Sequence, residues 1–258
     1  MYELYNGDCL DIMDKLMNEG IKVDLTVTSP PYDNLRTYNN SLRWSETVWK
    51  KVIEMLYKIT CDGGVVVWIV ADATIKGSET GTSFKQALYA KECGFNIHDT
   101  MIWNKEFNMP RPSNRYENSM EYMFVFSKGK PKTVNLIKDK KNKLFGKKLS
   151  GNKTNKNGKN IRLHGASNGK TVAEFGTRSN VWLQTTARRD ATYSHPAPFP
   201  EQLVRDHITT WSNKNDLVFD CFMGSGTTGV VCKYYNRDFI GIEIDELYFG
   251  IAKERITQ

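Results

Sequence analysis

Residues 217–229 have the sequence LVFDCFMGSGTTG, which predicts a short apolar strand, a glycine-rich loop and the start of a helix. Glycines in such a loop let the backbone pass close to a ligand at the carboxyl end of a strand. The next predicted strand ends at Glu243, nineteen residues after Gly224. An acid at that spacing suits hydrogen bonding to ribose hydroxyls. This order of elements is typical of half a dinucleotide-binding site.

The loop differs from two well-known nucleotide-binding motifs. Gly224 and Gly226 supply only the first half of a G-x-G-x-x-G motif, and no lysine follows Gly226 as in a P-loop. The sequence therefore favours neither NAD nor ATP as the ligand. An ordinary strand-to-helix turn is the alternative interpretation of the loop taken by itself.

The 258-residue chain alternates strand-like and helix-like segments throughout. Apolar or β-branched runs predict strands at residues 2–5, 23–28, 65–71, 95–103, 121–126, 217–220 and 239–243. Helical spacing predicts helices at residues 9–17, 49–59, 83–93, 203–211, 226–235 and 245–256. This alternation predicts an α/β fold, with a mostly parallel, twisted sheet and helices on both faces. The length and the 40% hydrophobic content suit one domain that carries an insertion.

The composition argues against several classes of protein. The longest apolar run, residues 63–71, is too short to span a membrane, and the N-terminus has no signal-peptide pattern. We therefore expect a cytoplasmic protein. Without a CxxC pair, a zinc site or a disulfide framework is not expected. We expect no metal site, and free thiols at Cys9, Cys61, Cys93, Cys221 and Cys232.

The net charge of +7 is unevenly distributed. Residues 128–170 contain fourteen lysines and arginines and one acid, Asp139, whereas the rest of the chain carries a net charge of −6. A basic segment on an acidic body indicates a polyanionic partner. The alternative is a solvated lysine-rich loop that binds nothing in particular.

A second motif, TSPPY at residues 28–32, follows the predicted strand 23–28. Pro30 and Pro31 fix the backbone and lack N–H donors, but their carbonyl groups still accept hydrogen bonds. Ser29 adds a hydroxyl group and Tyr32 adds an aromatic face. Such a pocket suits an amino group on a planar ring. A simple Pro-Pro turn is the alternative for an isolated motif.

Together, SPPY and DCFMGSGTT resemble the DNA methyltransferases that methylate amino groups. The catalytic motif precedes the cofactor motif, as in the permuted beta class of that family. Further matches are NGDCL (6–10), EYMFVF (121–126), NVW (180–182), HPAPFPE (195–201) and RDFIGIE (237–243). Cys221 departs from the pattern, because proline is commoner there. Residues 128–178 match no motif and occupy the place of the variable target-recognition region.

The resemblance implies one catalytic domain, residues 1–258, with a Rossmann-like S-adenosylmethionine-dependent methyltransferase fold and a basic inserted target-recognition region at 128–178. It implies site-specific methyl transfer from S-adenosyl-L-methionine to a base flipped out of double-stranded DNA. The acceptor is N4 of cytosine or N6 of adenine. Serine at the first motif position resembles the cytosine enzymes somewhat more, but it does not decide the base.

The resemblance also assigns residues to roles. The implied catalytic residues are Ser29, Pro30, Pro31 and Tyr32. The implied cofactor-binding residues are Asp8, Cys9, Ser29, His195, Pro196, Phe199, Asp220, Phe222, Gly224, Ser225, Gly226, Thr227 and Glu243. Within this set Asp8 would contact the adenine, Asp220 and the glycine loop the amino-acid portion, and Glu243 the ribose. A structural role is preferred for His195 over that of a base.

Several alternatives stay open. An RNA or protein methyltransferase of the same chemistry and an inactive DNA-binding protein with a methyltransferase fold are both compatible with the motifs. A homodimer and a cognate restriction endonuclease are expectations from the class, and no membrane partner is expected. A 5-methylcytosine enzyme is disfavoured, since none of the cysteines follows a proline. The sequence does not reveal the recognition site or a restriction-modification, orphan or phage context.

Overall fold

The computed structural model describes residues 1–31, 44–109, 114–149, 151–162, 169–184 and 200–258. The contacts divide the chain into two compact units. The first comprises Met1–Asn135 and Asn180–Gln258, and the second comprises Leu136–Ser179. No helix among the described residues is long and apolar enough to cross a membrane.

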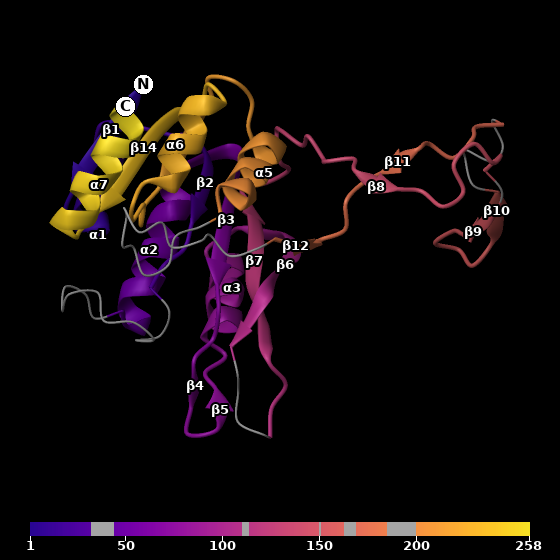
Figure 1. The fold of residues 1–258 in the computed structure, drawn as a ribbon, viewed down its shortest axis with the longest axis horizontal. Helices are drawn as coiled ribbons and strands as arrows, with labels where there is room; N and C mark the ends of the chain where they lie inside the picture. The colour runs from indigo at the N-terminus through magenta and orange to yellow at the C-terminus, as the bar shows by residue number, and fades with distance from the viewer. Residues whose placement is uncertain (32–43, 110–113, 150, 163–168, 185–199) are drawn as a thin grey trace. The chain divides into compact units, whose positions relative to one another are not determined.

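The first unit is built on an eight-stranded sheet with the order β1-β14-β13-β2-β3-β7-β6-β12 (Figure 1). The strands are β1 (Tyr2–Asn6), β2 (Val23–Thr28), β3 (Thr60–Val70), β6 (Asn96–Met109), β7 (Asn118–Ser127), β12 (Val181–Leu183), β13 (Leu217–Asp220) and β14 (Asp238–Glu243). Neighbouring strands are parallel except at β7, which is antiparallel to both β3 and β6. A small hairpin of β4 (Thr74–Ile75) and β5 (Ser78–Glu79) follows β3. The predicted mostly parallel α/β fold is confirmed.

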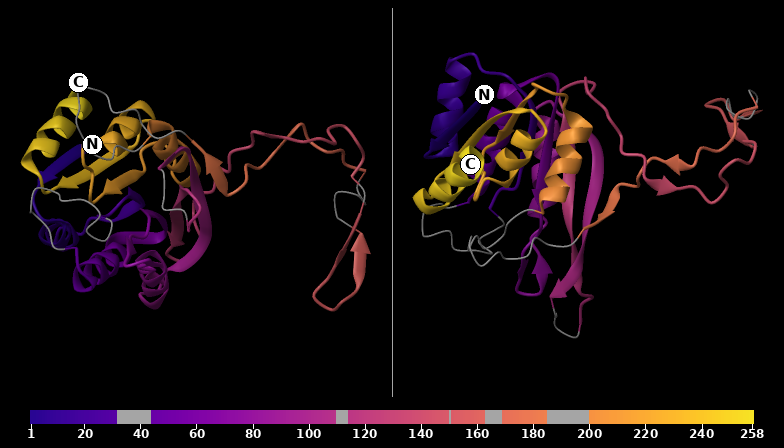
Figure 2. Two further views of the ribbon diagram at one scale, coloured as in Figure 1. Left: turned by 60° about the horizontal axis from the view of Figure 1, so that its bottom comes forward. Right: turned by 45° about the horizontal axis from the view of Figure 1, so that its top comes forward.

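Helices cover both faces of this sheet (Figure 2). The indigo-to-purple helices α1 (Cys9–Asn18), α2 (Glu46–Ile59) and α3 (Thr82–Glu92) pack on one face. The orange-to-yellow helices α5 (Glu201–Trp211), α6 (Thr227–Tyr234) and α7 (Glu246–Thr257) pack on the other. Each face of the sheet has its own apolar core, and strand β3 contributes to both because successive side chains point to opposite faces. Trp68 packs in the core beneath α1, α2 and α3, and Val67 packs in the core beneath α5, α6 and α7. A strand buried on both faces is a continuous apolar run, which is why residues 65–70 were recognisable in the sequence.

Parallel pairing brings the sequence motifs to one edge of the sheet. Asn6 of β1 is opposite Glu243 of β14, and Asp220 of β13 is opposite Gly241 of β14. Strand β2, which ends at Thr28, pairs with β13 in the same direction. Ligands bind outside the carboxyl ends of strands in open α/β sheets, so this edge is the candidate site.

The second unit contains two antiparallel pairs of short strands. Strand β8 (Lys140–Lys141) pairs with β11 (Phe175–Gly176), and β9 (Asn152–Thr154) pairs with β10 (Asn160–Arg162). Their side chains are almost all exposed. This unit therefore presents its lysines to solvent and has little core of its own.

Three lysines of the basic stretch, Lys128, Lys130 and Lys132, lie in the first unit instead. Lys128 Nζ donates to the carbonyls of Tyr57 (3.0 Å) and Thr60 (2.9 Å), and Lys132 forms an ion pair with Asp24. These two cations stabilise the junction of α2, β2 and β3.

Candidate active site at the carboxyl edge of the sheet

Asp220 links the two principal sequence motifs. Its carboxylate accepts hydrogen bonds from Thr28 Oγ1 (2.7 Å) at the end of β2 and from Thr228 Oγ1 (2.7 Å) in α6, and also from the Phe222 amide (3.1 Å). The side chains of Asp220, Thr28 and Thr228 are all buried. The strand that leads into Ser29 is thereby tied to the glycine loop.

Burial also perturbs the charge of Asp220. Desolvation raises the pKa of this carboxyl group to about 6, although the hydrogen bonds from Thr228 and Thr28 act in the opposite direction. Burying a charged carboxylate destabilises the folded protein, and perturbed pKa values of this kind cluster at functional sites. Asp220 is therefore a candidate functional residue.

Glu243 is held by backbone amides at the end of β14. Its Oε2 accepts from the Gly224 amide and its Oε1 from the Asp245 amide, each at 2.9 Å. Burial raises the pKa of Glu243, and these amides oppose that change. Each carboxylate oxygen has a second lone pair, so the fixed carboxylate can still accept from hydroxyl groups.

The glycine loop is shaped by left-handed backbone conformations. Gly224 has φ 53° and Gly226 has φ 82°. A Cβ atom on Gly226 would lie 2.9 Å from Ala252 Cβ in α7, so only glycine fits without movement. Arg255 of α7 donates to the Ser225 carbonyl (2.6 Å), which fixes the other side of the loop. The bare backbone at Gly224 therefore stays close to Glu243.

Asp8 and Cys9 follow β1 on the same edge. Asp8 is the N-cap of α1, where its side chain accepts from the Leu10 amide at 2.8 Å. Cys9 is buried, and burial raises its pKa to about 12, so it is a neutral thiol that packs as a small apolar side chain. The cap was not anticipated from the sequence, although an acid before an apolar helical stripe is its usual signal.

The catalytic motif is only partly within the described residues. Ser29, Pro30 and Pro31 directly follow β2, with Pro30 buried and its neighbours half-buried. Tyr32, His195, Pro196 and Phe199 were also predicted for this site, and they lie outside the described residues. The predicted catalytic and cofactor-binding residues that the structure describes thus lie together at the ends of β1, β2, β13 and β14.

Sequence reasoning missed one aromatic neighbour of the loop. The Trp44 ring lies 5.5 Å from the Phe222 ring, with the two planes at 88°. No motif or periodicity marks Trp44, because it stands alone before the first turn of α2. Thr28 and Thr228 were inside the quoted motifs, but their pairing with Asp220 was not foreseen.

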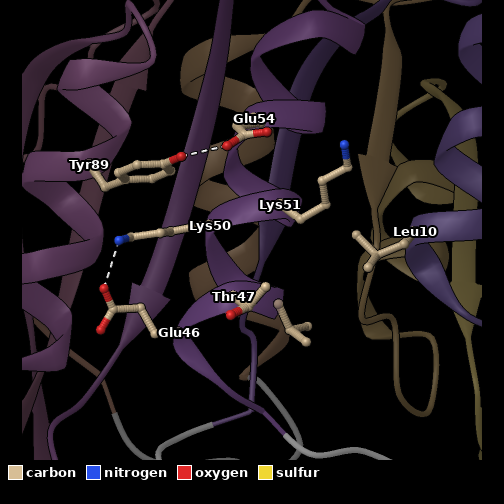
Figure 3. A pocket seen from close by; sticks show the side chains of 8 residues that line it. Leu10, Glu46, Thr47, Lys50, Lys51, Glu54 and Tyr89 are labelled. Carbon is tan, nitrogen blue, oxygen red and sulfur yellow. Dashed lines mark hydrogen bonds and ion pairs between the residues drawn. The ribbon is translucent and has the colours of Figure 1, made fainter.

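A groove of about 520 Å³ lies elsewhere, between α1, α2 and α3 (Figure 3). Its lining comprises Leu10, Glu46, Thr47, Val48, Lys50, Lys51, Glu54 and Tyr89. Glu46 and Lys50 form an ion pair there, and the Tyr89 hydroxyl donates to Glu54. Among the predicted catalytic and cofactor-binding residues that the structure describes, none lines this groove. Among the described residues, no group of three or more His, Cys, Asp and Glu side chains could hold a metal ion.

Comparisons with known proteins agree with this geometry. Residues 23–254 match the N6/N4 methyltransferase family model, described as DNA methylase. The chain is 50% identical over 242 residues to the orphan methyltransferase M.BamHII of Bacillus amyloliquefaciens, covering 91% of this chain and 88% of that protein. It is 27% identical over 278 residues to the type II methyltransferase M1.MboII of Moraxella bovis, covering 99% and 96%. The solved structure of the M1.HpyAVI–SAM complex is similar, with a TM-score of 0.67 at 26% identity, covering 99% of this chain and all of that one.

Proposed function

The chain belongs to the DNA methylase family of N6 and N4 methyltransferases, and from this premise we propose which residues carry out its reaction. It is an S-adenosylmethionine-dependent DNA methyltransferase that methylates an exocyclic amino group, N4 of cytosine or N6 of adenine. The observation that supports the residue assignment best is the Thr28–Asp220–Thr228 network. It joins the strand before Ser29 to the loop that would hold the cofactor.

The residues around the glycine loop fit S-adenosylmethionine, which supplies an electrophilic methyl group when bound. The fixed Glu243 carboxylate suits two ribose hydroxyls, and the exposed part of Phe222 suits the flat adenine ring. Asp8 would accept from the adenine amino group. Asp220 and the backbone of Gly224 and Gly226 would face the amino-acid portion. Ser225 and Thr227 flank this backbone, while Cys9 would pack near the adenine ring and His195, Pro196 and Phe199 would line the methionine end.

The catalytic motif would act by positioning and by accepting hydrogen bonds. The target nitrogen is a poor nucleophile, because its lone pair is delocalised into the base. Ser29 Oγ and the Pro30 carbonyl would accept its hydrogens and favour a pyramidal nitrogen whose lone pair can attack. Pro31 keeps the backbone rigid. This chemistry needs no covalent bond between enzyme and base.

Capture of the base would use Tyr32 and the basic segment. Flipping a base out of duplex DNA costs a few kcal/mol, and stacking on an aromatic ring recovers about 1–3 kcal/mol. Tyr32 would provide that ring. We propose residues 128–178 as the target-recognition region, because their lysines suit the phosphates of double-stranded DNA.

The quaternary and cellular context extends this proposal. A homodimer, a cognate restriction endonuclease and a cytoplasmic location are consistent with a DNA-modifying enzyme. Sedimentation of the purified protein tests the dimer, and digestion of methylated and unmethylated DNA by a candidate endonuclease tests the pairing.

Mass spectrometry of nucleosides tests the function directly. Unmodified duplex DNA is incubated with the protein and S-adenosylmethionine, alongside Ser29→Ala and a matched control, Ser78→Ala, which changes an exposed serine in the β4–β5 hairpin. We expect N4-methyldeoxycytidine or N6-methyldeoxyadenosine from the wild type and the control, and a strong loss with Ser29→Ala. Methylated RNA but unmodified DNA would support the RNA alternative. Cofactor binding without any modified base would support the inactive DNA-binding alternative.

A further inference from the structure

Trp44 lies beside the cofactor loop at the start of α2. It precedes Ser45, whose side chain caps this helix by accepting from the Val48 amide at 3.4 Å. The indole is 7% exposed and packs at right angles to Phe222. This edge-to-face arrangement is the one that aromatic rings prefer, so Trp44 fixes the orientation of the Phe222 ring.

The indole of Trp44 has a buried donor that lacks a partner. Its Nε1 has no hydrogen bond among the described residues, as is also true of Trp211 Nε1 at the end of α5. In contrast, Trp68 Nε1 donates to Gln86 Oε1 and Trp103 Nε1 to the Gln184 carbonyl, both at 2.9 Å. A buried indole N–H usually has a partner, because leaving it unpaired is costly. The cost at Trp44 would be removed by an acceptor that arrives with a ligand.

Trp44 shares its apolar core with residues that are proposed to bind the cofactor. The same apolar core contains Cys9 and, partly buried, Leu10, which follow the Asp8 cap of α1. Figure 3 shows Leu10 facing the first turn of α2. Trp44 therefore lies in the core that includes both Phe222 and the start of α1, the two places assigned to the adenine ring.

We propose that Trp44 is part of the adenosine end of the cofactor site: it holds Phe222 against the adenine ring, and its Nε1–H donates a hydrogen bond to the bound nucleoside. Adenine ring nitrogens and ribose oxygens are acceptors suited to an indole donor. The proposal rests on the cofactor role proposed for Phe222.

The variants Trp44→Phe and Trp49→Phe separate this role from simple packing. Trp44→Phe keeps an aromatic ring but removes the donor. Trp49→Phe makes the same change at a buried tryptophan of α2 that packs on Tyr89. Calorimetry measures the affinity for S-adenosylmethionine and for adenosine, and thermal unfolding measures the stability of the protein without cofactor.

We expect Trp44→Phe to weaken binding of both ligands by roughly tenfold, while its unfolding temperature without cofactor falls no further than that of Trp49→Phe. Trp49→Phe should leave both affinities unchanged. Wild-type affinities in Trp44→Phe, or equal losses in the two variants, would overturn the proposal. If Trp44→Phe does not fold, the indole ¹H–¹⁵N signals of the wild type serve instead. One indole signal must shift when adenosine binds, and the absence of such a shift would refute the role. A wild type that binds no S-adenosylmethionine would instead contradict the function itself.

Discussion

Replacing Asp220 with asparagine should stabilise the free protein at neutral pH while impairing the site. Asparagine has nearly the shape of aspartate, but it carries no charge. Its Nδ2 must donate where a carboxylate oxygen accepted. Because Oδ1 also accepts from the Phe222 amide, which cannot accept, Nδ2 takes the Oδ2 position and the Thr228 hydroxyl has to turn and accept instead. Hydroxyl groups can do either, and the rearrangement costs about 1 kcal/mol.

The magnitude follows from the pKa of the buried carboxyl group. Burial raises the pKa of Asp220 from 3.8 to about 6, a change worth about 3 kcal/mol once the group is ionised. Because the folded pKa is the higher one, stability is fully retained below about pH 4 and is lost as the pH rises through about 6. Asp220→Asn should then be about 2 kcal/mol more stable than the wild type at pH 8, and about 1 kcal/mol less stable at pH 4.

Urea denaturation from pH 4 to pH 8 measures this crossover. Asp14→Asn, on the exposed face of α1, is the matched control and should follow the wild type throughout. Burial also raises the pKa of Glu243, so part of the pH dependence should persist in every variant. A stability curve of Asp220→Asn parallel to that of the wild type would refute the assignment of the perturbed pKa to Asp220. Calorimetry should show weaker binding of S-adenosylmethionine, since the carboxylate is proposed to face its amino-acid portion.

Three further predictions test other parts of the structure. Gly226→Ala should lower the free energy of unfolding by several kcal/mol, because its Cβ would meet Ala252. Gly20→Ala, with a similar φ of 78° but open space, should cost only about 1 kcal/mol, and equal losses would refute the steric argument. Tyr32→Ala should reduce turnover but leave the affinity for S-adenosylmethionine near the wild-type value in calorimetry, and loss of cofactor binding would contradict its role. Removing residues 138–159 should flatten the dependence of DNA affinity on salt, as measured by titration at several salt concentrations, and an unchanged slope would make that segment a mere solvated loop.

The sequence predicted most of the sheet but not its one reversed strand. Residues 65–70 and 121–126 are both mostly apolar runs. Such a run indicates that a strand is buried, but it does not indicate whether the strand is parallel or antiparallel to its neighbours. Strand β7 is antiparallel because it returns along β6, which extends to Met109, well past the predicted end at 103. The exposed β4–β5 hairpin was missed, since a pair of two-residue strands has no detectable period.

The candidate site was likewise only partly predictable from the sequence. Motifs such as 220–226 are local, so their loop and the following acid were recognisable from spacing alone. The bond from Thr28 to Asp220 joins residues 192 apart, and Trp44 contacts Phe222 only because α2 packs beside the loop. Contacts of that kind depend on the complete fold, so no spacing along the chain predicts them.

The cost of burying Asp220 supports the view that this edge of the sheet is the working site. Ionised Asp220 carries a net cost of about 3 kcal/mol, a large fraction of the stability of an ordinary domain, and a neutral residue there would avoid it. Thr28 and Thr228 reduce that cost but do not remove it, because the pKa remains raised even with their hydrogen bonds. The unpaired Nε1 of Trp44 adds a second unfavourable buried group next to the same loop. These two costs lie next to the same loop. They are expected if a bound cofactor contacts both groups and provides the interactions that the free protein lacks.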